Sequence, residues 1–226
     1  MPIRAKIYAS TIVAAGAITL AFAAAQWTCQ SPTRFLACLC LALLGSTFKV
    51  KLPGMDSCIT PSFIPFLFAA GTMSWPETAV IAAFSGILQT LWKPKRRPAP
   101  IQAFFNGANL AIAIAIGFAV SHAAAPDRIS VQLVITVIVF EVLNTLSVST
   151  VVGLITGSSL SGIWRNCHLW TFPFHLVGAA LAAVWAQSEL ALSVSVTVFG
   201  AVTLYLMSAF YQELVRHNTP TEVLAS

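Results

Sequence analysis

Apolar residues recur along the chain in eight runs, and short stretches that hold most of the charged residues separate them. A helix needs roughly 20 apolar residues to cross a bilayer, because each residue adds about 1.5 Å to its length. Four runs come close to this length or exceed it, and they lie near 7–27, 101–122, 131–156 and 191–212. The pattern therefore predicts an all-α, polytopic membrane helix bundle.

The other four runs are shorter and lie near 34–48, 60–73, 77–92 and 170–187. Pro61 and Pro65 lie in the second of these, and proline disfavours a long regular helix. We expect the second and third to form either two full spans or a shallow, re-entrant hairpin, which gives six to eight spans. The turn between them reads Ser74-Trp-Pro-Glu77, in which Ser74 fits a helix N-cap and Glu77 completes a capping box.

The composition excludes a soluble domain. Of the 226 residues, 58% are hydrophobic and only 8% are charged, whereas soluble domains carry about 25% charged residues. The mean hydropathy is +0.84. We therefore expect residues 1–226 to form one transmembrane helical domain, with a short cytoplasmic tail from about residue 213.

The basic residues are distributed unevenly between the two sides that this helix pattern defines. If the N-terminus is cytoplasmic, Arg34 and Arg128 are the two basic residues that face outward. Such a bias is typical of the positive-inside rule, so we expect both termini to be cytoplasmic. The inward-facing residues are Arg4, Lys6, Lys49, Lys51, Lys93, Lys95, Arg96, Arg97, Arg165 and Arg216.

One loop gathers four of these charges: Lys93, Lys95, Arg96 and Arg97 in the stretch Leu91-Trp-Lys-Pro-Lys-Arg-Arg-Pro98. We interpret it as a short cytoplasmic loop that fixes the ends of the helices on either side. Docking of anionic lipid or of a protein partner is the alternative. We expect no nucleic-acid binding, because no soluble domain accompanies the loop.

The N-terminal 26 residues resemble a signal peptide, with two basic residues, an apolar stretch and Ala23-Ala-Ala25. We expect an uncleaved first helix, because the apolar stretch is long. The five cysteines are scattered without a CxxC motif. Cysteines of this kind are usually small buried hydrophobic residues, so we expect neither a metal site nor a cofactor.

Polar side chains recur at helical spacing inside the apolar runs, where lipid or protein should surround them. Such residues usually face other helices or a cavity. We expect these faces to converge on one intramembrane polar pocket. Interhelical hydrogen bonding without a ligand is the alternative, particularly for the Asn and Gln residues. The residues concerned are Gln89, Gln102, Asn106, Asn109, Glu141, Asn144 and His175, and Thr171 lies one turn before the last of these.

Glu141 is the main charge of this predicted pocket. It lies near the middle of its run, where an ionised carboxylate is costly unless it is paired, so we expect Glu141 to be protonated or hydrogen-bonded. We expect His175 or an Asn amide to be its partner. The chain carries no GxSxG, HExxH, Walker or Rossmann motif, and its other acids fall in loops, helix ends or the tail. We therefore expect no enzyme activity.

Two stretches, 48–120 and 144–184, resemble the N-terminal multi-helix membrane region of bacterial, notably acidobacterial, signalling proteins. The features that carry the resemblance are Lys51-Leu-Pro-Gly54, Ser74-Trp-Pro-Glu77, the basic loop, Phe105-Asn106 and Trp170-Thr-Phe-Pro173. In that family a GGDEF-type diguanylate cyclase or an HD-type phosphohydrolase domain follows the membrane region. The resemblance implies a bacterial inner membrane and a sensor-like role. It carries over no ligand-binding residues.

The chain ends at Tyr211-Gln-Glu-Leu-Val-Arg-His-Asn-Thr-Pro-Thr-Glu-Val-Leu-Ala-Ser226 without such an output domain. Our first hypothesis is therefore a free-standing sensory or ligand-binding membrane module that signals through a protein partner. The alternative is a small-molecule transport subunit similar to the substrate-binding component of energy-coupling-factor transporters. A third hypothesis is a non-catalytic assembly subunit of a larger membrane complex.

Overall fold

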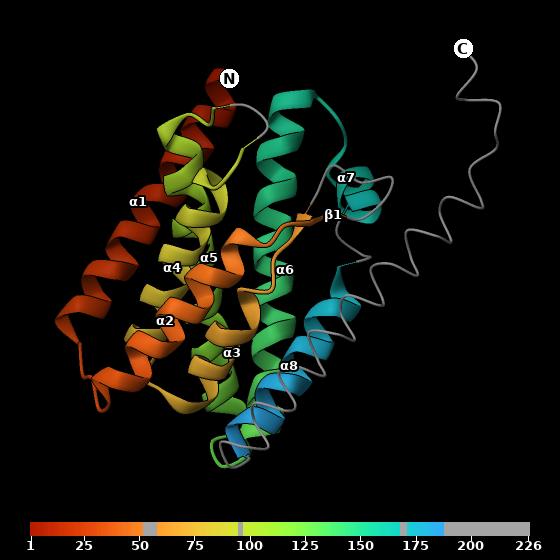
Figure 1. Cartoon of the computed structure of the whole chain (residues 1–226). Coiled ribbons are helices and arrows are strands. Elements are labelled where there is room, and N and C mark those ends of the chain that lie inside the picture. Colours follow the sequence, from red (N-terminus) through yellow and green to blue (C-terminus); the bar gives the residue numbers. More distant parts are fainter. Residues whose placement is uncertain (52–57, 95–96, 168–170, 188–226) are drawn as a thin grey trace.

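The computed structural model describes residues 1–51, 58–94, 97–167 and 171–187, and within these the chain is a helical bundle (Figure 1). A single antiparallel ladder of two residues per strand, β1 (Val50–Lys51) with β2 (Cys58–Ile59), accompanies the helices. The predicted eighth run, 191–212, and the tail from 213 lie outside the described residues. The predicted all-α architecture is confirmed for the described part.

The helices follow the apolar runs closely, with ends that shift by a few residues. They are α1 (Ile3–Ala25), α2 (Pro32–Thr47), α3 (Phe63–Thr72), α4 (Trp75–Leu91), α5 (Pro100–Ala124), α6 (Ile129–Thr156), α7 (Leu160–Cys167) and α8 (Phe172–Gln187). Helices α1, α5 and α6 are long and apolar enough to cross a membrane, whereas α2, α3 and α8 are shorter apolar helices.

The apolar runs do not predict α7. This helix has only 8 residues and is amphipathic, so it forms no continuous apolar run. An amphipathic pattern of that length marks a helix that lies along a boundary between apolar and polar surroundings.

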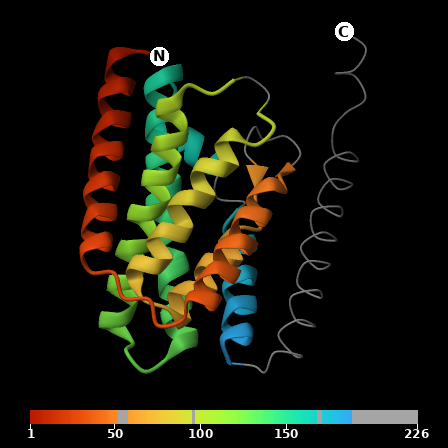
Figure 2. The same ribbon diagram turned by 60° about the vertical axis from the view of Figure 1, so that its left-hand side comes forward.

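Helix α5 occupies the centre of the bundle, and α1, α4 and α6 pack around it (Figure 2). Glycines allow the closest of these approaches. A Cβ atom at Gly86 of α4 would lie 2.8 Å from the backbone oxygen of Asn106 in α5, and one at Gly16 of α1 would lie 2.3 Å from Cβ of Ala108. The helix backbones therefore touch where a larger residue would hold them apart.

Helices α3 and α4 form the hairpin that the turn Ser74-Trp-Pro-Glu77 predicts. Oε2 of Glu77 accepts the backbone N–H of Ser74 at 3.1 Å and its hydroxyl at 2.8 Å. The N-cap at Ser74 is thus confirmed. Helix α3 has only 10 residues, or about 15 Å of length, so it reaches about halfway through the thickness of a bilayer core.

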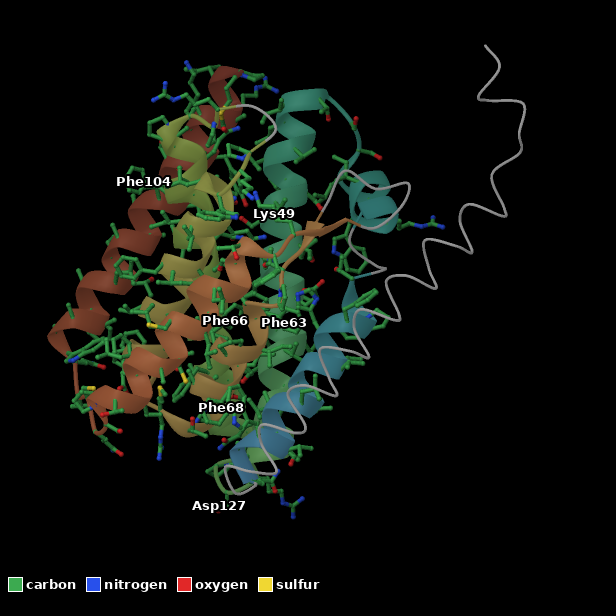
Figure 3. The ribbon with its side chains drawn as sticks, viewed as in Figure 1. Lys49, Phe63, Phe66, Phe68, Phe104 and Asp127 are labelled. Carbon is green, nitrogen blue, oxygen red and sulfur yellow. The ribbon has the colours of Figure 1, made fainter. Side chains whose placement is uncertain are left out.

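The chain alternates in direction, so its loops collect at two ends of the bundle. The N-terminus, the linker from α4 to α5 and the end of α6 lie at one end, and the turn that holds Asp127 lies at the other (Figures 1 and 3). Arg4 and Lys6, in the first turn of α1, share the first end with Lys93 and Arg97. These four basic residues therefore lie at one end of the bundle, as the sequence predicts for them.

Candidate functional site

A cavity of about 220 Å³ lies inside the bundle, between α3, α4, α5, α6 and the start of α8. Nine of its fourteen lining residues are polar, and the buried side chains of Phe63 and Phe66 line it from α3, whose place in the bundle Figure 3 shows. Its polar lining consists of Thr60, Ser62, Gln89, Asn106, Glu141, Asn144, Thr145, Thr171 and His175. Five separate parts of the chain thus contribute polar groups to one interior space.

Glu141 is the charged centre of this cavity. It lies near the middle of α6, and only 3% of its surface is exposed. The hydroxyl of Thr171 donates a hydrogen bond of 2.6 Å to its Oε1. Nδ1 of His175 lies 3.2 Å from Oε2. The predicted partner, His175, is therefore the neighbour of this carboxylate, and the Asn amides are not.

The second carboxylate oxygen has no hydrogen-bond partner within the described chain. Nδ1 of His175 lies 3.0 Å from the backbone oxygen of Thr171, which can only accept. The ring hydrogen on Nδ1 is therefore directed to that carbonyl. Oε2 of Glu141 remains buried and without a hydrogen bond among the described residues, which is rare for a buried polar atom.

Helix α8 begins beside this carboxylate, and α3 begins at the wall of the same cavity. Helix α3 begins at Phe63 and α8 begins at Phe172. The ring of Phe63 lies 4.5 Å from the ring of His175, so the two N-terminal turns are neighbours. Helix N-termini carry free N–H groups and a partial positive charge, which stabilise a nearby carboxylate.

Two amide side chains extend the polar wall. Nδ2 of Asn106 donates a hydrogen bond of 2.7 Å to the hydroxyl of Thr90. This leaves Oδ1 of Asn106 as the end of the amide that can accept from a ligand. Gln89, the residue before Thr90 in α4, also lines the cavity.

The structure brings together five of the seven side chains that the sequence predicts for one pocket. Glu141, Asn144, Asn106, Gln89 and His175 all line the cavity. They come from α4, α5, α6 and α8, so their proximity depends on how four helices pack.

Gln102 and Asn109 do not line this cavity. Oε1 of Gln102 accepts the backbone N–H of Ala99 at 2.9 Å, so it satisfies a free group at the start of α5. Nδ2 of Asn109 donates to Oδ1 of Asn144 at 2.7 Å, which links α5 to α6. Gln102, Asn106 and Asn109 form a polar stripe at helical spacing on α5, but each of them contacts different neighbours along the helix. Asn109 thus follows the alternative interpretation, interhelical hydrogen bonding.

Thr60 and Ser62 are lining residues that the sequence analysis did not select. Their hydroxyls lie 3.0 Å apart and both are buried. They precede α3 in a segment that reads as a helix start, so the sequence signals a cap and gives no sign of a cavity wall. Only the packing of α3 against α8 places them at the site.

The basic loop is not part of the cavity. The ammonium group of Lys93 lies 5.9 Å from the ring centre of Trp92, and Nζ of Lys49 donates to the backbone oxygen of Trp92. Lys95 and Arg96 lie outside the described residues, and no described Lys or Arg lines the cavity. Within the described part, no group of three His, Cys, Asp or Glu side chains is arranged to hold a metal ion.

In comparisons with known proteins, no family model, no curated protein and no solved structure matches the chain. The resemblance to bacterial signalling proteins therefore stays a prediction. The fold and the site define the class by themselves: a helical bundle with three helices apolar enough to cross a membrane, and a polar interior cavity with one buried carboxylate.

Proposed function

We propose that this chain is a multi-pass module of a bacterial inner membrane that binds a small polar molecule in the cavity around Glu141 and signals its binding to a protein partner. The observation that carries the proposal is the buried carboxylate oxygen that faces a polar cavity without a hydrogen bond. A buried polar group of this kind costs free energy unless a partner satisfies it. A ligand supplies that partner.

The size of the cavity supports a small ligand. Pockets for drug-sized ligands have volumes of roughly 300–1,000 Å³, whereas this cavity has a volume of about 220 Å³. About seven water molecules occupy this volume in liquid water. We therefore expect a compact metabolite and no lipid or peptide.

The membrane orientation follows from the charge segregation. The end with Arg4, Lys6, Lys93 and Arg97 is the cytoplasmic end under the positive-inside rule. The partner then meets the module at this end.

A route from the cavity toward that end supports signalling. Nε1 of Trp164, in α7, donates a hydrogen bond of 3.0 Å to the hydroxyl of Thr145, which lines the cavity. The same hydroxyl bonds the backbone oxygen of Glu141. A ligand that displaces the α6 wall thus acts on α7 through one side chain. A ligand biases such an arrangement only if it binds one of two states more tightly.

The test is co-purification of a small molecule in mild detergent, detected by native mass spectrometry. We expect a bound compound in the wild type and its loss in Gln89→Trp, because the larger ring fills the cavity. The matched control is Phe84→Trp, which changes a 53% exposed residue of the same helix. Loss in both variants, or a wild type that retains no compound from a cell extract, contradicts the proposal.

A transport subunit is the second candidate, and the short helices favour it. Transporter sites often lie at the ends of interrupted helices inside the membrane, and α3 and α8 both begin beside the cavity. Uptake of the co-purified compound into vesicles, lost in Glu141→Gln, distinguishes transport from sensing. An assembly subunit predicts that Glu141→Gln leaves both ligand content and partner binding unchanged.

A further inference from the structure

We infer that the cavity takes a small organic ammonium ion with an apolar or aromatic body; the inference rests on the proposed function and names its ligand class. The acceptors are Oε2 of Glu141, which has no hydrogen bond among the described residues, and Oδ1 of Asn106, whose amide nitrogen is already bonded to Thr90. An ammonium group carries several N–H donors and no acceptor. Its N–H groups match these two acceptors, and the wall also offers a donor in the amide nitrogen of Asn144, whose oxygen already accepts from Asn109.

The charge of the wall disfavours an anion. Glu141 is the one carboxylate among the described lining residues, no described Lys or Arg lines the cavity, and His175, 3.2 Å from Oε2, is the one lining group there that can become cationic. A second negative charge about 4 Å from Glu141 would bind a hundredfold or more weaker than a neutral analogue, because the cavity screens charges poorly.

The apolar wall accounts for the body of the ligand. Phe63, Phe66 and Phe140 line the same cavity, and each is at most 3% exposed. Aromatic faces attract cations within about 6 Å and also bury apolar groups. His175 lies between the aromatic wall and the carboxylate, since its ring contacts Phe63 and its Nδ1 lies beside Glu141. The cavity therefore has one acceptor end and one aromatic wall.

The test uses three probes of similar size that differ in charge: phenethylammonium, 2-phenylethanol and phenylacetate. Binding to the full chain in detergent is measured by isothermal titration calorimetry and by the fluorescence of Trp164, with Trp164→Phe as the optical blank. We expect phenethylammonium to bind at least about tenfold more tightly than 2-phenylethanol. We expect phenylacetate not to bind.

Glu141→Gln should remove the preference for the ammonium probe. Glu77→Gln is the matched control, because Glu77 is also 3% exposed but caps α4 away from the cavity, and it should keep the preference. The wild-type comparison of the three probes decides the question even if Glu141→Gln does not fold.

Equal or tighter binding of 2-phenylethanol or phenylacetate overturns the ammonium inference and leaves the proposed function standing. Absence of binding by all three probes also overturns it. The proposed function is tested separately, by whether a small molecule co-purifies with the wild type and is lost in Gln89→Trp.

Discussion

At the scale of single residues, the buried polar side chains of this bundle separate into two kinds. Asn109 and Asn144 are bonded to each other across α5 and α6. Glu141 keeps one oxygen without a hydrogen bond among the described residues, and Asn106 keeps one free amide oxygen. The first kind holds helices together, and the second kind faces the cavity, whereas Asn144 does both. Spacing along a helix cannot distinguish them, because both kinds lie on the same stripe of α5.

This distinction predicts opposite effects for two similar substitutions. Asn109→Ala should cost only about 0.6 kcal/mol of stability, the average for such bonds in membranes, and should leave ligand binding unchanged. Asn106→Ala should weaken binding by roughly tenfold, because it removes an acceptor of the cavity wall. Unfolding in mixed micelles measures the change in stability, and calorimetry measures the change in ligand binding. A larger loss of binding in Asn109→Ala than in Asn106→Ala contradicts the assignment.

At the scale of elements, the packing of α4 on α5 depends on glycines at the crossing. Gly86 faces the backbone of Asn106 and Gly107, and a Cβ at Gly107 would lie 2.9 Å from the backbone oxygen of Ala83. Backbone atoms cannot rotate away as side chains can. The two helices carry Gln89 and Asn106 into the cavity wall, so this contact also sets the shape of the site.

Gly86→Ala should therefore destabilise the bundle by about 1–3 kcal/mol, the usual cost of overpacking, although alanine favours helix by roughly 1 kcal/mol over glycine. Gly71→Ala is the control, because its Cβ would meet only side chains of Ile129 and Leu133 at 3.4 Å. Thermal unfolding in detergent compares the two. Equal stability of both variants would show that the α4–α5 crossing has room to relax.

At the scale of the whole molecule, the alternation of helices separates the charges between two ends. The first end carries Lys93 and Arg97, and the turn 26–31 lies at the opposite end with Cys29 (Figures 1 and 2). Charge segregation of this kind orients a bundle in the membrane, because basic loops are retained in the cytoplasm.

A membrane-impermeant thiol reagent should therefore label Cys29 in intact spheroplasts and should not label a Lys93→Cys variant. Each cysteine is tested with the other cysteines replaced by serine. Both positions should react after the membrane is permeabilised, which controls for burial. Labelling of Lys93→Cys in intact spheroplasts, or recovery of the protein without detergent, contradicts the orientation and the membrane assignment.

The sequence by itself determined the elements and much of the site. Periodic apolar runs predict seven of the described helices, because a helix in lipid must be apolar over most of its length. The capping residues of α4 are predicted because a cap depends on residues only three positions apart. The proximity of His175 to Glu141 is also predicted, since a carboxylate inside a bundle needs a polar neighbour and the chain offers few.

Only the tertiary structure decided which polar residues share one space. It separates Gln102 and Asn109 from the cavity, adds Thr60 and Ser62 to its wall, and places the start of α8 beside Glu141. It also shows α7, whose short amphipathic pattern forms no apolar run. The physical reason is that local pattern fixes which face of a helix is polar, whereas the depth and angle at which helices cross fix what that face meets.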